Sequence, residues 1–142
     1  MTTAKIDVSP IIPPTPAHLD RRTIYTLTSP RYWAGTYILV KMLRHYGCDV
    51  QVCVYTTEYD ELPDAMRELR RTLFFPSDHT GATVAKARCD LLLNTQDRYV
   101  GYLGSDVYPV QNVTPCFEHL ADREAIFWED IPDGDKFLPE QY

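Results

Sequence analysis

The sequence lacks most of the features that identify a function at first sight. It has no basic excess: 14 Lys and Arg stand against 20 Asp and Glu, and the net charge is −6. A nucleic-acid-binding protein usually needs a basic face, so the overall charge argues against one. No apolar run approaches the roughly 20 residues of a membrane span. Residues 1–20 also lack the pattern of a signal peptide. A soluble, cytoplasmic protein is therefore expected.

Several chemical motifs are also missing. The four cysteines form no C-x-x-C pair and the four histidines have no metal-ligand spacing, which argues against a zinc knuckle or a thioredoxin-type site. The glycine-rich phosphate loops G-x-x-x-x-G-K-[ST] and G-x-G-x-x-G are absent, as is the G-x-S-x-G of serine hydrolases. Because Cys48 and Cys53 border or sit in an apolar segment, they are expected to be buried, reduced thiols.

What is present suits one globular domain. Hydrophobic residues make up 44% of the 142 residues and charged residues 24%, which is enough for a packed core. Four prolines within residues 10–16 predict that residues 1–20 form an extended arm. The domain is expected over residues 21–142, with an irregular acidic tail from about residue 129.

Strand and helix patterns alternate through the domain. Segments rich in β-branched and aromatic residues predict strands at 23–28, 49–55, 73–75, 99–103 and 125–128. Helical spacing predicts helices at 32–46, 63–73, about 80–93 and 115–120. Gly47 stands where a glycine ends a helix. This order predicts an α/β fold with an open, mostly parallel sheet flanked by helices, in one small domain.

The expected helices also predict which side chains face the core and which face solvent. In residues 32–46, Leu39 and Leu43 are expected to face the core and Arg44 to point away. The second helix is expected to turn Leu73 towards the core. Three arginines of that region are expected to form a solvated face, and these are Arg67, Arg70 and Arg71.

Parallel sheets bind ligands outside the carboxyl ends of their strands, and two such ends carry suitable residues. The first is residues 28–32, which lead into a helix whose N-terminal N–H groups favour a phosphate. Arg31 adds a positive charge, and Tyr32 or Trp33 has the shape to stack on a base. The alternative is that Tyr32 and Trp33 only anchor the helix to the sheet.

The second strand end is Gly104-Ser105-Asp106. A carboxylate at a strand terminus is well placed to hold a divalent cation that bridges two phosphates. The alternative is an ordinary turn, because Gly-Ser-Asp is also turn chemistry.

In three segments the sequence resembles the GT-A glycosyltransferases, above all the fungal α-mannosyltransferase and glycogenin-like groups. Residues 25–48 resemble the opening strand and helix with its "YWAG" cluster, and residues 86–106 the helix and strand that lead to "YLDSD". Residues 107–130 resemble the continuation that ends in "FW-x-D". The resemblance implies a nucleoside diphosphate-sugar donor, Mn²⁺ or Mg²⁺ on an Asp-x-Asp pair, and sugar transfer to a hydroxyl acceptor.

Carried over position by position, the resemblance assigns a donor site and one metal ligand. Asp106 matches the second Asp of the pair and is the expected metal ligand, and Lys86 matches a basic residue on the donor. The remaining donor-binding residues are Thr28, Ser29, Arg31, Tyr32 and Ser105.

Two departures from the family leave a second reading open. Gly104 replaces the first Asp of the pair, and the resemblance stops near Asp130, before the acceptor-binding half. A homo-oligomer or a partner chain is then expected to supply that half. Glu129 or Asp130 is a possible second metal ligand, and Glu118, Asp122 and Asp133 are candidate bases by elimination. The alternative function is a non-catalytic binding or scaffold protein. A nucleic-acid-modifying transferase is a third reading, which would require a local basic groove.

Overall fold

The computed structural model describes residues 22–94, 97 and 99–120. Four strands form one sheet in the order β3-β2-β1-β4, and every neighbouring pair is parallel. The strands are β1 (Arg22–Thr28), β2 (Gln51–Thr56), β3 (Thr72–Pro76) and β4 (Tyr99–Tyr102). The expected α/β fold with an open parallel sheet is confirmed. The expected arm, the strand at 125–128 and the acidic tail lie outside the described residues.

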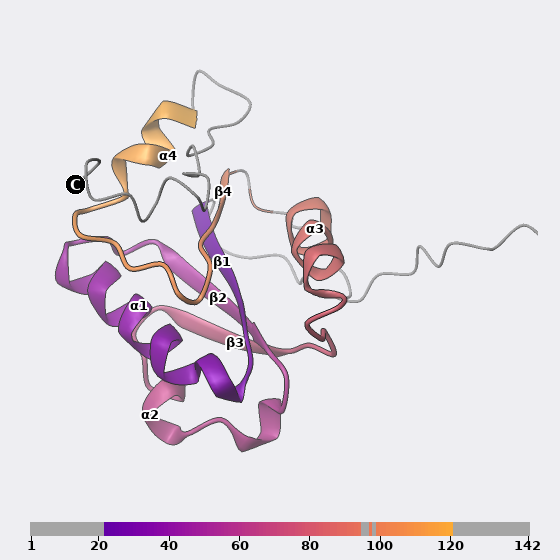
Figure 1. Cartoon of the computed structure of the whole chain (residues 1–142). Coiled ribbons are helices and arrows are strands. Elements are labelled where there is room, and N and C mark those ends of the chain that lie inside the picture. The colour runs from indigo at the N-terminus through magenta and orange to yellow at the C-terminus, as the bar shows by residue number, and fades with distance from the viewer. Residues whose placement is uncertain (1–21, 95–96, 98, 121–142) are drawn as a thin grey trace, which may run out of the picture.

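Helices cover both faces of this sheet (Figure 1). Those on one face are α1 (Trp33–His45) and the single turn α2 (Asp64–Arg67), and α3 (Val84–Asn94) covers the other face. The short helix α4 (Pro115–His119) follows β4. Two 3-10 helices, η1 (Pro30–Tyr32) and η2 (Tyr59–Glu61), lie in the connections. Among the described residues, no helix is both long enough and apolar enough to span a membrane.

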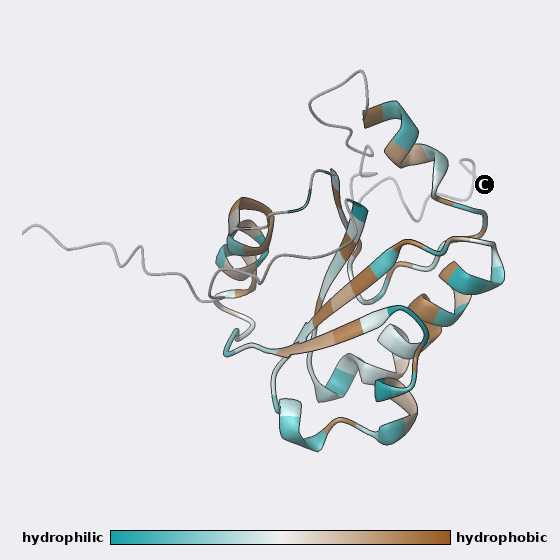
Figure 2. Cartoon of the chain, turned by 180° about the vertical axis from the view of Figure 1, so that it is seen from behind, coloured by the Kyte–Doolittle hydropathy of each residue, from teal (hydrophilic) through white to brown (hydrophobic). Residues whose placement is uncertain are grey.

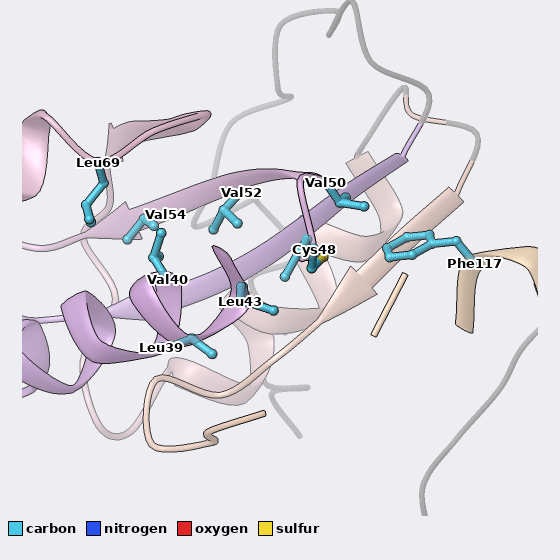
Figure 3. Close-up of a cluster of buried hydrophobic side chains, with 10 residues drawn as sticks. Leu39, Val40, Leu43, Cys48, Val50, Val52, Val54, Leu69 and Phe117 are labelled. Carbon is cyan, nitrogen blue, oxygen red and sulfur yellow. The ribbon is translucent and has the colours of Figure 1, made fainter. Parts of the chain in front are cut away.

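The two-residue period of the strands divides the core into two halves. On one face, Leu39, Val40 and Leu43 of α1 pack on residues of β1 and β2, and Phe117 of α4 completes the cluster (Figure 3). On the other face, Ala87 and Leu91 of α3 pack on Tyr25, Leu27, Cys53 and Tyr55. Figure 2 shows that hydrophobic residues occupy the central parts of the strands, whereas many of the connecting loops are hydrophilic.

The cysteines in the sheet behave as small hydrophobic residues. Cys48 and Cys53 are both 0% exposed and are free thiols. Burial, together with the nearby Asp97, raises the pKa of the Cys53 thiol to about 12. This thiol therefore stays protonated at neutral pH and is a poor nucleophile.

The second helix is shorter than the sequence predicts. A helix was expected over 63–73, but α2 ends at Arg67 and the chain then turns into β3. Arg71 takes a left-handed backbone conformation with φ of 50°, which no helix continues. Leu73 therefore lies on β3 and is 43% exposed, so its expected place in the core is wrong.

Arg44 lies outside the core cluster and points away from it as expected, but its guanidinium contacts the backbone of neighbouring turns. Its guanidinium donates hydrogen bonds to the carbonyl oxygens of Cys48 and Val50, both at 2.8 Å, and of Arg70 and Arg71, both at 3.0 Å. Gly47 ends α1 as expected, with φ of 86°. Arg44 thus joins the end of α1 to the turns that precede β2 and β3.

The hydroxyl of Thr26 is a buried polar group whose cost to the stability of the core can be measured. The Thr26 hydroxyl is buried on β1 and has no hydrogen-bond partner among the described residues. A desolvated hydroxyl without a partner costs about 1–3 kcal/mol. We expect Thr26→Val, which keeps the shape, to raise the free energy of unfolding by about 1 kcal/mol in urea denaturation.

Thr36→Val provides the matched control, because the Thr36 hydroxyl lies 2.7 Å from the Thr28 hydroxyl and 3.0 Å from the Tyr32 carbonyl oxygen. We expect this variant to lose about 1–3 kcal/mol. Equal effects of the two substitutions would contradict this account.

Candidate functional site

The strand order places a topological switch point between β1 and β4. From β1 the chain moves outward through β2 to β3, and it then returns to the other side of β1 as β4. In open parallel sheets, ligands bind outside the carboxyl ends of the strands at such a point. The residues that follow β1 and β4 are the two segments that the sequence analysis selected.

The two strands do not end at the same level. β4 ends where Tyr102 pairs with Tyr25, and the Leu103 N–H donates to the Tyr25 carbonyl oxygen at 3.1 Å. β1 continues to Thr28, so it extends about 10 Å beyond β4 at roughly 3.3 Å per residue. The chain leaves β4 through a turn that is closed by the Val107 N–H and the Gly104 carbonyl oxygen at 3.0 Å.

This turn packs against the first turn of α1 through a glycine. A Cβ added to Gly35 would lie 2.9 Å from the Tyr108 hydroxyl and 3.0 Å from the Ser105 carbonyl oxygen. An added Cβ would require the Tyr108 hydroxyl to shift and the Ser105 carbonyl group to move by a few tenths of an ångström. The absence of a side chain at Gly35 therefore brings the turn with Asp106 next to the start of α1.

Asp106 is exposed in this turn, and Ser105 is half-buried beneath it. The Asp106 carboxylate lies over Gly104, since a Cβ on Gly104 would be 3.0 Å from Asp106 Oδ1. A side chain at position 104 would consequently lie beside that carboxylate.

The segment before α1 offers a cation and an aromatic ring. Arg31 and Tyr32 are exposed, and the Arg31 guanidinium lies 5.6 Å from the centre of the Tyr32 ring. Ser29 precedes η1 and is half-buried. The 13 residues of α1 have no acidic residue in their first turn, so their dipole favours an anion at this end.

Two of the predicted donor residues do not present their side chains to this surface, Thr28 because it is buried and Lys86 because it lies on the opposite face. Thr28 is only 2% exposed, and its hydroxyl is paired with that of Thr36, so its side chain holds α1 on the sheet. Lys86 belongs to α3 on the opposite face, where its Nζ lies 3.4 Å from Asp90 Oδ2. Ser29, Arg31, Tyr32, Ser105 and Asp106 all lie near the start of α1.

Trp33 anchors the helix α1 to the sheet, which was one of the two roles expected for it. Its Nε1 donates to the Thr56 hydroxyl at 2.8 Å, which ties the first residue of α1 to the end of β2. The buried Thr56 in turn donates to the Thr57 carbonyl oxygen. Tyr32, by contrast, is 46% exposed and remains accessible.

The described residues do not form a resident metal site. None of them belongs to a group of three or more His, Cys, Asp and Glu that could hold an ion. Asp106 alone supplies one carboxylate, whereas Mg²⁺ sites normally use one or two carboxylates together with substrate phosphates. Glu129 and Asp130, the expected second ligands, lie outside the described residues. A Mn²⁺ or Mg²⁺ ion would therefore depend on oxygen atoms that a ligand brings.

A serine and a histidine at the end of β3 were missed by the sequence analysis. The Ser77 hydroxyl and His79 Nδ1 are 2.7 Å apart, and the His79 N–H donates to the same hydroxyl at 3.3 Å. Burial lowers the pKa of His79, so its ring is neutral at pH 7. Metal-ligand spacing among the histidines does not reveal this pair. The signal for it in the sequence is that Ser77 and His79 follow an aromatic strand.

The candidate bases do not gather at this edge. Glu118 is exposed on α4, which lies at the opposite end of the sheet from the start of α1 (Figure 1). Asp122 and Asp133 lie outside the described residues. No base for an acceptor hydroxyl is assigned.

Comparison with known proteins adds no assignment. No protein-family model matches the sequence, and no curated protein matches it.

The close approach at Gly35 can be tested by adding one methyl group. We expect Gly35→Ala to push the turn at 104–108 away from α1, with a cost of about 1–3 kcal/mol from overpacking. In a solvent-exposed helix, alanine would instead add about 1 kcal/mol of stability relative to glycine. Thermal and urea unfolding show whether Gly35→Ala lowers or raises the free energy of unfolding.

Gly81→Ala is the matched control, because a Cβ there meets no atom within 4 Å. We expect its stability to stay within about 0.5 kcal/mol of the wild type. A Gly35→Ala variant that is as stable as the control would show that the turn does not depend on this contact.

Proposed function

We propose that the chain binds a nucleoside diphosphate-sugar at the β1–β4 edge and serves as the donor-binding domain of a glycosyltransferase. The observation that supports this most is the contact at Gly35. It joins the segment before α1 to the turn that carries Asp106, and both lie within the stretches for which the sequence resembles GT-A enzymes. Their positions at a topological switch point match the usual ligand site of open parallel sheets.

Each side chain near the start of α1 has a chemical role in this proposal. The N-terminal end of α1 and Arg31 attract the diphosphate, since helix dipole and guanidinium both favour an anion. The exposed Tyr32 ring offers a surface on which the base stacks. Asp106 accepts hydrogen bonds from hydroxyl groups of the donor.

The transfer itself exchanges one bond for another. The bond from the anomeric carbon to the diphosphate oxygen breaks and the nucleoside diphosphate leaves. A bond to the acceptor oxygen forms, and the proton of the acceptor hydroxyl passes to the released diphosphate or to water. The described residues contribute binding and orientation of the donor. We derive no step through a metal ion, because Asp106 alone does not form a site for one. The acceptor half belongs, in this proposal, to a partner chain or a second copy.

Donor binding tests the proposal directly. Titration of the protein with UDP-glucose and GDP-mannose, with and without Mn²⁺, should give a measurable affinity for at least one donor. We expect Asp106→Ala to weaken it about tenfold or more, because hydrogen bonds to a charged group contribute about 1.5–3 kcal/mol. Asp106 is exposed, so the thermal stability of the variant should match the wild type.

Glu118→Ala is the control, since it removes an exposed carboxylate at the other end of the sheet. Its donor affinity should be that of the wild type. Absence of donor binding in the wild type, or unchanged binding in Asp106→Ala, would overturn the proposal.

A second candidate function, a non-catalytic binding or scaffold domain, is favoured by Gly104 in particular. With glycine at this position, half of the acidic pair is absent, and the described residues contain no group that could hold a metal. A domain of this kind would keep the fold and the surface around α1 while transferring nothing.

Gly104→Asp separates the two functions. The Gly104 backbone does not have a positive φ, so it accepts aspartate once the exposed Asp106 side chain, whose Oδ1 would be 3.0 Å from the added Cβ, shifts by a few tenths of an ångström. The two carboxylates should repel one another without metal and bind Mn²⁺ together. If the donor site is intact, we expect Mn²⁺ to strengthen UDP- or GDP-sugar binding in this variant. Gly104→Asn controls for size without charge. Mn²⁺ binding with no donor binding would favour the scaffold function.

A further inference from the structure

The strand β3 lies at one edge of the sheet. In the order β3-β2-β1-β4 it pairs with β2 on one side, and among the described residues no strand lies along its other side. We call that side the outer edge of β3. An edge strand presents backbone N–H and C=O groups with which a further strand can pair. Charged side chains within a strand usually protect such an edge, but the five residues Thr72–Pro76 include none.

Two hydrogen bonds show which backbone groups of β3 point to the outer edge. The Arg71 carbonyl oxygen accepts from an N–H of β2 at 3.0 Å, and the Ser77 N–H donates to a carbonyl oxygen of β2 at 2.9 Å. Successive residues of a strand point these groups to opposite sides. The N–H and C=O groups of Thr72 and Phe74 therefore point outward, away from β2.

Opposite charges flank β3 at equal distances from its middle residue. Arg70 lies four residues before Phe74, and Asp78 lies four residues after it. Both side chains are exposed. Arg70 also forms an ion pair with Asp49, but its side chain is 59% exposed there, and an exposed ion pair of this kind is weak. Two antiparallel β3 strands centred on Phe74 would place Arg70 of each copy opposite Asp78 of the other.

We propose that two copies of the chain pair through the outer edges of β3, antiparallel about a two-fold axis at Phe74. The two Phe74 residues then exchange both of their backbone hydrogen bonds, as residues of a hydrogen-bonded pair do. The Thr72 N–H donates to the Pro76 carbonyl oxygen of the second copy. Because both copies use the same edge, the interface is closed and the assembly stops at a dimer.

The same alignment gives Leu73 an apolar partner. Leu73 is 43% exposed at this edge. In the dimer it lies opposite Phe75 of the second copy, in a non-hydrogen-bonded pair, where side chains approach most closely. Aliphatic and aromatic side chains that face one another across two strands stabilise their pairing. Dimerisation thus covers an apolar side chain that the single copy leaves partly in water.

Other two-fold alignments lack the charge match. An axis at Thr72 would place Arg70 opposite Phe74, and an axis at Pro76 would place Asp78 opposite Phe74. Both would also shorten the overlap of the strands. With five residues in each strand the interface is small, so the dimer is weak and depends on protein concentration. It does not depend on the proposed donor binding.

Charge reversal tests the alignment. Arg70→Glu makes both flanking pairs acidic, and Asp78→Lys makes both of them basic. We expect each variant alone to dimerise about tenfold or more weakly than the wild type in sedimentation equilibrium, because two attractive pairs become repulsive. An equimolar mixture of the two variants should associate like the wild type, since each pair then joins opposite charges. A mixture that regains affinity cannot be explained by misfolding.

Amide hydrogen exchange, followed by NMR, shows which backbone groups pair. At high protein concentration we expect the outward-pointing amides of Thr72 and Phe74 to exchange more slowly than at low concentration. The amides of Leu73 and Phe75 point to β2, so their exchange should depend much less on concentration.

Two controls separate this edge from general charge and from the donor site. Lys41→Glu makes the same charge change as Arg70→Glu on the exposed surface of α1, and it should dimerise like the wild type. Asp106→Ala should also leave dimerisation unchanged, whether or not the protein binds a nucleotide-sugar.

Four results would overturn the proposal. The wild type could stay monomeric at every concentration, the mixed variants could fail to regain affinity, or Lys41→Glu could weaken association as much as Arg70→Glu does. The fourth is protection of the Thr72 and Phe74 amides to the same degree at every concentration. That result would mean that another segment of the same chain occupies the outer edge.

Discussion

The whole structure depends on the burial of β1 between two strands and two helical layers. Residues 23–28 are all buried, and β1 pairs with β2 on one side and with β4 on the other. On one face it meets α1 and on the other α3. Because β2, β4, α1 and α3 all pack against this strand, the register of β1 sets the level at which both ends of the sheet lie. The candidate donor site lies beyond one end of β1, and the turns bound by Arg44 lie at the other end of the sheet.

The sequence predicted the parts of this fold that depend on local periodicity. The alternation of strand and helix segments predicted the α/β class, and the period of residues 32–46 predicted the buried Leu39 and Leu43. The prediction of one helix over residues 63–73 was wrong at its C-terminal end. The spacing of Leu62, Met66 and Leu69 is helical and all three are buried, but it does not reveal that the chain leaves the helix at Arg67. That departure requires a left-handed residue, and it occurs at an arginine rather than at a glycine.

The candidate site was predictable in its segments but not in its contacts. Strand ends and a helix start pointed to residues 28–32 and to Asp106, and these segments do lie on the two sides of Gly35. Which side chains reach solvent depends on tertiary packing instead. Thr28 is the last residue of the strand predicted at 23–28, and in the structure the packing of this strand buries it. Lys86 lies on the opposite face because α3 packs there. The hydrogen bonds of Arg44 are equally invisible in sequence, because their acceptors are backbone carbonyl groups that only the fold assembles.

Helix α1 contacts both ends of the sheet. Its first turn carries Gly35, against which the turn with Asp106 packs, and its last turn carries Arg44, which binds the turns before β2 and β3. At 1.5 Å per residue the helix is a rod of about 20 Å, and its buried face is held in a close-packed core. A rigid displacement of α1 would therefore change the contacts of Gly35 and of Arg44 together, although these contacts lie at opposite ends of the sheet.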